Sequence, residues 1–297
     1  MARGNQRDLA RAKNLKKQQE HSKSQKKEGD PKKRMESDAE KMRKKQAEGM
    51  CPDYVVLDNL AKFPGVIVYS EIYQVTGPVA RFAKDIAGQG FIAIAPSIYH
   101  NFESHEALAY DNEGTDKGNS YKIEKELSSY DEDNRLAIEY LESLPTFNGK
   151  IGATGMCLGG HLAFRAALDP RVSASFCFFA TDIHIHALGK GKNDDSLKRS
   201  KEIKGELVMV FGDKDNHVPL EGRDLIRSTL RRNPTQLTFI EINEAQHAFV
   251  RDENSKDRYD AAVTGLCFQW LLELFNRRLK LDYGEHDGKD VVIEDVC

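Results

Sequence analysis

Gly155-Met156-Cys157-Leu158-Gly159-Gly160 is the stretch of sequence that decides the fold. It follows a short apolar run at 150–154 and precedes helix-forming residues at 161–168. A strand, a nucleophile between glycines and then a helix form a nucleophile elbow, usually G-x-S-x-G, here with cysteine in place of serine. The glycines are needed because strand and helix approach too closely for a Cβ. The stretch therefore predicts that Cys157 is a nucleophile on a sharp turn.

The chemistry of a thiol fits this place. The predicted helix begins directly after Cys157, and the free N–H groups and dipole at a helix N-terminus favour a thiolate over a thiol. A cysteine can also be no more than a small buried side chain, as we expect for Cys177 and Cys267, which lie in apolar patterns. The flanking glycines favour the catalytic interpretation of Cys157.

Short apolar runs alternate with helical patterns around this elbow. Strands are predicted at 65–69, 91–95, 172–180, 206–212 and 236–242, and helices at 77–87, 121–144 (in one or two pieces), 220–232 and 258–279. Long polar loops are predicted at 97–120 and 181–200. Repeated βαβ order predicts a mostly parallel sheet covered by helices on both faces. Together with the nucleophile elbow, this order indicates an α/β-hydrolase fold.

Candidates for the rest of a catalytic triad follow the elbow in the expected order. In α/β-hydrolases the acid and then the histidine lie on loops after successive strands. Here Gly212-Asp213-Lys214-Asp215-Asn216-His217-Val218-Pro219 follows one strand, and Ala245-Gln246-His247-Ala248-Phe249 follows the next. His247 would take up and deliver a proton, and a carboxylate would fix its tautomer. The backbone N–H groups of Leu158 and Ile72 are predicted to stabilise the oxyanion.

Three motifs together resemble the dienelactone hydrolase family, the carboxymethylenebutenolidases. They are Gly155-x-Cys157-x-Gly159-Gly160, Asp215-x-x-Val218-Pro219 and Ala245-Gln246-His247-Ala248-Phe249, and the resemblance covers about residues 53–280. It implies that Asp215 is the triad acid, because Asp215 is in register with Val218-Pro219. It also implies a small lactone or activated ester as substrate, hydrolysed through a thioester acyl-enzyme, and no cofactor.

The same resemblance implies roles for four further residues. Glu71 matches an acidic residue that contacts the resting nucleophile until substrate displaces it. Arg251, four residues after His247, matches an arginine that binds the substrate carboxylate, a task suited to bidentate geometry. Lys117 is the nearest cation to the position of a second such arginine, and Tyr121 matches a pocket tyrosine. Structural alternatives are a helix cap or an arginine partner for Glu71 and a surface ion pair for Arg251.

Other polar residues are weaker candidates. His184 and His186 would lie on one side of an extended chain, as metal ligands can, but no third ligand is near in sequence, so no metal site is predicted. Asp182 could compete as the triad acid but follows a different strand. His161 and His217 are expected to line the pocket or to be structural. No Rossmann or P-loop glycine pattern is present, so no nucleotide is predicted.

The chain of 297 residues combines two segments of opposite charge. Residues 1–50 contain 16 Lys and Arg against 8 Asp and Glu, a net charge of +8, whereas the remainder carries −11. The first segment has almost no aromatic or β-branched residues and predicts a disordered basic tail. We expect a hydrolase domain at 51–281 and an acidic tail at 282–297.

The opening residues 1–18 closely resemble the small EDRK-rich factor family of short, basic, disordered proteins. This resemblance implies a possible second function, binding of RNA or another polyanion or modulation of aggregation, although a solvated tail without such a role is an equal alternative. A hydrolase fold that only binds ligands is a third alternative. Five widely spaced cysteines and the lack of an apolar leader or membrane-length run favour a cytoplasmic, or nuclear, protein without membrane contact.

Overall fold

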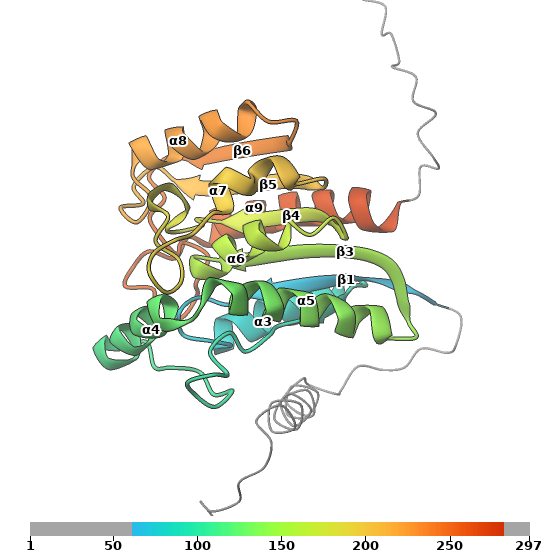
Figure 1. The fold of residues 1–297 in the computed structure, drawn as a ribbon, viewed down its shortest axis with the longest axis horizontal. Coiled ribbons are helices and arrows are strands. Elements are labelled where there is room, and N and C mark those ends of the chain that lie inside the picture. The colour runs from blue at the N-terminus through green and yellow to red at the C-terminus, as the bar shows by residue number, and fades with distance from the viewer. Residues whose placement is uncertain (1–60, 282–297) are drawn as a thin grey trace, which may run out of the picture. The chain divides into compact units, whose positions relative to one another are not determined.

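The computed structural model describes residues 61–281, which contain one six-stranded parallel sheet (Figure 1). The strands are β1 (Phe63–Tyr69), β2 (Ile92–Ile94), β3 (Phe147–Met156), β4 (Val172–Phe178), β5 (Glu206–Gly212) and β6 (Gln236–Ile242). They lie in the order β2-β1-β3-β4-β5-β6. The chain leaves β1 toward one edge and returns to the other side of β1 with β3, so the order reverses between these two strands. Ligands of open α/β sheets bind at the carboxyl ends of the strands where the order reverses.

Helices cover both faces of the sheet (Figure 1). They are α3 (Gly77–Gly88), α4 (Asn112–Glu124), α5 (Leu127–Ser143), α6 (Leu158–Ala166), α7 (Ser196–Arg199), α8 (Leu220–Arg231) and α9 (Ala261–Phe275). On one face α5, α6, α7 and α8 contact one another in sequence, and α6 packs on β1, β3 and β4. On the other face the Phe82 ring of α3 lies 5.7 Å from Phe268 of α9 and 5.8 Å from Phe178 of β4.

Burial explains why α6 is central. All nine of its residues are buried, including the polar His161 and Arg165. Strands β1, β4 and β5 are rich in β-branched and aromatic residues, as strands buried on both faces usually are. Cys177 and Cys267 are fully buried, which confirms that they are core residues. The predicted α/β-hydrolase fold is therefore present, with the elbow helix at its centre.

Two predicted boundaries are wrong. The loop expected over 97–120 ends early, because α4 begins at Asn112, where the side chain of Asp111 accepts a 2.8 Å hydrogen bond from the N–H of Gly114. This helix is almost entirely polar, so hydrophobic periodicity could not reveal it. The closing helix is regular only to Phe275 and continues as a π-helical turn, Asn276–Lys280. The loop over 181–200 contains two short helical turns, Ile183–Ile185 and α7.

Candidate active site

Cys157 lies on a strained turn between β3 and α6. Its φ is 60° and its ψ −118°, a conformation that non-glycine residues rarely adopt. The turn is held in place because the N–H of Cys157 donates to Phe178 O (3.1 Å) and Cys157 O accepts from His161 N (3.2 Å). Strain held by surrounding hydrogen bonds is a common feature of functional sites. Cys157 is partly exposed and is a free thiol.

The glycines of the elbow are required by close backbone contacts. A Cβ on Gly159 would lie 2.1 Å from Tyr69 O, and one on Gly155 would lie 2.4 Å from Gly159 O. A Cβ on Gly160 would lie 2.4 Å from Phe178 O. These neighbours are backbone atoms of β1 and β4 and of the elbow itself, so no side chain could rotate away to make room. Helix α6 can therefore begin directly over the sheet only with this glycine pattern.

Asp215 and His247 are brought together from the ends of β5 and β6. Their side chains are almost fully buried, and Asp215 Oδ2 lies 2.8 Å from His247 Nδ1. The other carboxylate oxygen of Asp215 accepts from His217 N (2.8 Å), which fixes the carboxylate. Burial alone would lower the pKa of His247, but the neighbouring Cys157 and the hydrogen bond with Asp215 raise it to about 10. The ring is therefore held as imidazolium beside the sulfur.

Two aromatic rings enclose the His247 imidazole. The Phe179 ring meets it edge-on, with centroids 4.9 Å apart, and the His217 ring stacks on it at 4.1 Å. Burial, and secondarily the charge of His247, lower the pKa of His217 to about 4, so His217 is neutral at physiological pH. His217 thus contacts the predicted triad without being part of it.

Leu158 and Ile72, the predicted oxyanion donors, follow the ends of two neighbouring strands. Leu158 is the first residue of α6, directly after the elbow that ends β3, and Ile72 lies in the turn after β1. Strands β1 and β3 are neighbours in the sheet. Neither backbone N–H donates a hydrogen bond to another of the described residues. Both amides are therefore available to a ligand.

Glu71 and Arg251 form a buried pair beside this cluster. Arg251 Nη1 lies 3.4 Å from Glu71 Oε2, and only 6% and 4% of the two residues are exposed. Burial would lower the pKa of Arg251, but the charge of Glu71 outweighs it and the pKa is raised. Within residues 61–281 no hydrogen bond or ion pair joins Glu71 to Cys157. Of the two structural alternatives for Glu71, a helix cap and an arginine partner, the structure shows the arginine partner. The ion pair of Arg251 is buried and is therefore not the surface ion pair considered as its alternative.

Two tyrosines that were not predicted as site residues lie beside the same pair. The Tyr110 hydroxyl donates to Glu71 Oε2 (3.4 Å), and Arg251 Cζ lies 4.5 Å from the centre of the Tyr110 ring. The Tyr73 ring lies 5.8 Å from Arg251 Cζ. Neither tyrosine belongs to a motif, and Tyr110 fell in the segment predicted as a loop. Tyr73 is two residues from Glu71 in the sequence, but Tyr110 is 39 residues away, so only the fold brings Tyr110 to this pair.

Lys117 and Tyr121 make their contacts elsewhere on α4. Lys117 is exposed and pairs with Glu113, one turn away on the same helix, at 3.1 Å. The Tyr121 hydroxyl donates to Glu103 (2.8 Å), and its ring stacks on Phe102 with centroids 4.9 Å apart. The structure therefore joins Cys157, His247 and Asp215 into one cluster and Glu71 with Arg251 into another, but shows no contact of Lys117 or Tyr121 with either.

The three weaker candidates on the loop after β4 have other surroundings than the predicted triad; they are Asp182, His184 and His186. Asp182 pairs with Lys122 at 2.9 Å, and the charge of Lys122 outweighs burial and lowers the pKa of Asp182. His184 packs beside Gly222 of α8, and His186 is exposed. Among the described residues no group of three or more His, Cys, Asp or Glu side chains could hold a metal ion.

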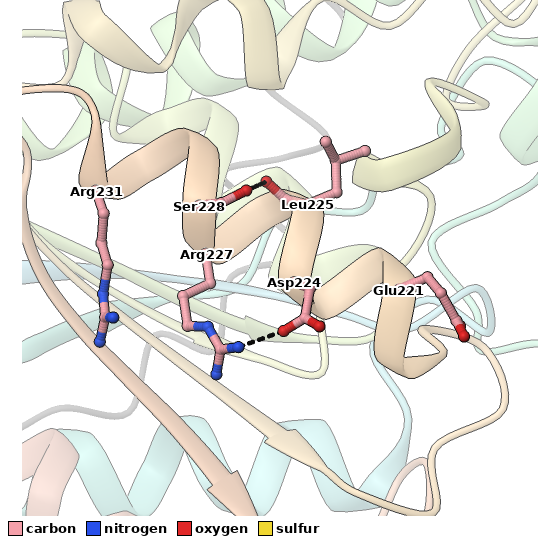
Figure 2. A pocket seen from close by; sticks show the side chains of 6 residues that line it. All are labelled: Glu221, Asp224, Leu225, Arg227, Ser228 and Arg231. Carbon is pink, nitrogen blue, oxygen red and sulfur yellow. Dashed lines mark hydrogen bonds and ion pairs between the residues drawn. The ribbon is translucent and has the colours of Figure 1, made fainter.

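The two hollows of the surface differ in their relation to the site. A hollow of about 540 Å³ runs along α8 and is lined by that helix alone, so it is an open groove rather than a pocket (Figure 2). It contains none of the predicted site residues. A smaller cavity of about 140 Å³ is lined by Glu71 and Arg251 together with residues of α3 and α9. No helix between residues 61 and 281 is long and apolar enough to cross a bilayer.

Comparison with known proteins identifies relatives of both parts of the chain. The sequence profile of the dienelactone hydrolase family matches residues 52–279, and the small EDRK-rich factor 1/2-like N-terminal profile matches residues 1–36. A carboxymethylenebutenolidase homologue of Saccharomyces cerevisiae is 59% identical over 241 residues, 80% of this chain and 88% of its own length. The carboxymethylenebutenolidase of Pseudomonas putida is 28% identical over 66% of this chain and 78% of its own.

A solved structure shares the fold. A dienelactone hydrolase-like promiscuous phosphotriesterase from metagenomic libraries superposes with a TM-score of 0.60 at 17% identity, over 73% of this chain and 87% of that one. Residues 1–50 and 282–297, for which a disordered basic tail and an acidic tail were predicted, lie outside the described residues.

Proposed function

The chain belongs to the dienelactone hydrolase family, and we propose that it hydrolyses its lactone or ester substrates through Cys157, with a thioester acyl-enzyme as intermediate. Family membership makes the protein a hydrolase of lactone or ester substrates. The observation that carries the finer proposal is the buried Asp215–His247 pair (2.8 Å), whose imidazole interacts with the partly exposed Cys157 on its strained turn. Nucleophile, base and orienting carboxylate are the three roles that such a reaction needs.

Acylation follows from this arrangement. The Cys157 thiolate attacks the carbonyl carbon, and the carbonyl π electrons move to the oxygen, which accepts from the N–H groups of Leu158 and Ile72. The tetrahedral intermediate collapses, the C–O bond to the leaving alkoxide breaks, and His247 delivers its proton to that oxygen. For a lactone this step opens the ring, and the alcohol stays attached to the acyl group.

Deacylation reverses the proton transfer. His247, now neutral, removes a proton from water as the oxygen attacks the thioester carbonyl. The C–S bond then breaks, Cys157 departs as thiolate beside the imidazolium, and a carboxylic acid is released as its anion. Asp215 remains ionised throughout and holds the Nδ1–H of His247 in one orientation.

Substrate orientation is proposed to depend on Arg251. A carboxylate on the substrate could take the place of Glu71 on the guanidinium. Arg251 would then exchange one carboxylate partner for another and would not be left unpaired. Lys117 and Tyr121 keep a proposed role only if substrate binding brings them toward the pocket, because their contacts in the structure are on the outside of α4. The alternative function, binding of RNA or another polyanion by the basic tail, is not favoured.

Intact mass spectrometry tests the proposal. The full chain is mixed with p-nitrophenyl acetate and, separately, with a cis-dienelactone, and quenched in acid within milliseconds to seconds. A transient mass increase on the Cys157 peptide, absent from Cys157→Ala, is expected. Turnover of both substrates by Cys157→Ala would exclude this nucleophile, and acetylation without lactone turnover would place the natural substrate among other esters.

A further inference from the structure

Tyr110 has a set of contacts that the reaction as described does not use. Its hydroxyl lies 2.7 Å from Thr76 Oγ1 and donates to Glu71 Oε2 (3.4 Å). Because that hydroxyl has a single proton, Thr76 is the donor to Tyr110 and Tyr110 the donor to Glu71. The face of the same ring lies 4.5 Å from Arg251 Cζ, within the range of a cation–π interaction. One side chain thus contacts both members of the buried ion pair.

The ion pair alone holds Glu71 weakly. Its single contact of 3.4 Å is long and is not bidentate, and Arg251 Nε is buried without a hydrogen-bond partner among the described residues. The cavity of about 140 Å³ that Glu71 and Arg251 line leaves room for the carboxylate to move. A buried pair of poor geometry recovers little of its desolvation cost. The hydroxyl and the ring of Tyr110 supply the contacts that the pair lacks.

The surroundings keep Tyr110 in place. Its ring meets Tyr73 with centroids 4.6 Å apart, and the Tyr73 hydroxyl lies 2.9 Å from Thr115 of α4. Arg251 itself is tied at its other end, where Nη2 donates to Asn254 O (3.2 Å). Burial, and then the charge of Glu71, raise the pKa of Tyr110, so the phenol keeps its proton at physiological pH. It is therefore a constant donor to Glu71.

We propose that Tyr110 is a positioning residue that holds Glu71 on Arg251 and away from Cys157, so that the nucleophile rests as thiolate before substrate arrives. A second negative charge near the sulfur would disfavour the thiolate. With Glu71 held elsewhere, no substrate carboxylate is needed to free Cys157. The site then accepts neutral lactones and esters as well as anionic ones, and a substrate carboxylate changes KM more than kcat. This inference rests on the proposed role of Cys157.

None of the titratable groups described below takes over the role of Tyr110 as a hydrogen-bond donor to Glu71. Of the charged residues that line the cavity, Arg81 pairs with Asp252 (2.7 Å) and with Glu253 (2.8 Å). Asp85 is the remaining acidic residue of the lining. Near Cys157 the titratable groups include His247 with Asp215, the neutral His217 stacked on His247, and the buried Tyr99, whose pKa burial raises. None of these donates a hydrogen bond to Glu71.

The rate at which iodoacetamide alkylates Cys157 tests the proposal, because this neutral reagent reports the thiolate. The full chain is used, and adduct at Cys157 is followed by peptide mass between pH 5 and 9. In Tyr110→Phe, which keeps the ring, we expect alkylation to slow about tenfold at pH values below the wild-type midpoint. The pH of half-maximal rate should rise by about one unit, equivalent to that tenfold change. Hydrolysis of a neutral ester should lose kcat by a similar factor.

Two further variants separate positioning from simple destabilisation. In a Glu71→Gln background no charge has to be held, so adding Tyr110→Phe should have no further effect on alkylation. Tyr130→Phe removes another buried hydroxyl, which donates to Lys122 O (3.3 Å), and should leave the profile unchanged. Equal alkylation profiles for wild type and Tyr110→Phe would overturn the proposal while leaving Cys157 as nucleophile. Full turnover by Cys157→Ala would instead remove the proposed function itself.

Discussion

Two histidine–aspartate pairs lie at helix α6, one at its N-terminus and one along its length, and only the first is suited to catalysis. At its N-terminus His247 and Asp215 are 2.8 Å apart, next to Cys157. Along its length His161 Nε2 lies 2.9 Å from Ser196 Oγ and 3.3 Å from Asp194 Oδ2. The second group even has the residue types of a serine hydrolase triad.

Three physical differences separate these clusters. The second cluster is closed, because the side chains of His161 and Asp194 have no exposed surface, whereas Cys157 is partly exposed. Ser196 Oγ donates to Asp194 (2.5 Å) and accepts from Arg165 (2.9 Å) and from His161 Nε2 (2.9 Å), so its proton and both lone pairs are already in use. Cys157 has a strained φ of 60° and free amides nearby, and Ser196 has neither. Access, unused bonding capacity and strain distinguish a site from a structural network.

The largest difference in kcat between the two clusters is expected when Cys157 in the first and Ser196 in the second are each replaced by alanine. Cys157→Ala should lower kcat on the order of 10⁶-fold, as for loss of the nucleophile in other hydrolases of this type. Ser196→Ala should leave kcat within about threefold and cost about 1–3 kcal/mol of unfolding free energy, because it leaves buried partners unsatisfied. Steady-state ester hydrolysis and urea unfolding measure the two effects. An active Cys157→Ala or an inactive, folded Ser196→Ala would reverse the assignment of the two clusters.

Asp215→Asn should come next. The amide can neither fix the correct tautomer of His247 nor stabilise its charged form, so kcat should fall on the order of 10⁴-fold. Structure near the site should be little changed, and Asp194→Asn is the matched substitution in the second cluster. It should alter stability rather than kcat. A kcat unchanged by Asp215→Asn in single-turnover kinetics would mean that another group orients His247.

Arg165 should matter for stability alone. Its guanidinium contacts Asp131 (2.7 Å) and Asp194 (3.0 Å) and is almost completely buried. Arg165→Met keeps much of the packing but leaves Asp194 buried and uncompensated, at a cost of about 3–5 kcal/mol. Denaturant unfolding should detect this loss, whereas kcat per folded molecule should stay near that of wild type. A kcat loss without a stability loss would link the second cluster to catalysis.

The two clusters should respond at opposite ends of the pH scale. Burial would raise the pKa of Asp194, but the neighbouring His161, the hydrogen bond from Ser196 and the charge of Arg165 outweigh it and lower the pKa to about 2. Its stabilisation, about 2 kcal/mol, is present above the unfolded value near 4 and is lost as the pH falls through about 2. The pKa of His247 is raised to about 10, so its contribution is complete below about 6.5 and is lost as the pH rises through about 10.

Of these two transitions, activity should follow that of His247 and not that of Asp194, because His247 loses above pH 10 the proton that it delivers to the leaving group. Imidazole NMR titration should show a lower pKa for His247 in Cys157→Ala, since the interaction with the sulfur is removed. Urea unfolding between pH 2 and 5 should show the acid loss in wild type and a smaller one in Asp194→Asn. A His247 pKa that is the same in Cys157→Ala and wild type would contradict the coupling of these two residues.

The sequence alone determined the fold and the position of Cys157, His247 and Asp215 in it. Local chemistry is enough for this, because the glycines around Cys157 are required by backbone contacts and the two loops after β5 and β6 follow in fixed order. Helix α4 escaped prediction because its stability depends on the Asp111 cap and on tertiary contacts rather than on an apolar stripe.

Only the tertiary structure decided which charges meet. Glu71 and Arg251 are 180 positions apart in sequence, and Tyr110 reaches them from a third segment, so no local pattern could reveal their contact. Lys117 is the opposite case, because it pairs with Glu113 four residues earlier on its own helix, and this local pair follows once α4 is known. A motif specifies the residues that the backbone of one turn requires. The partner of a long charged side chain depends instead on which opposite charges the fold places within a few ångströms.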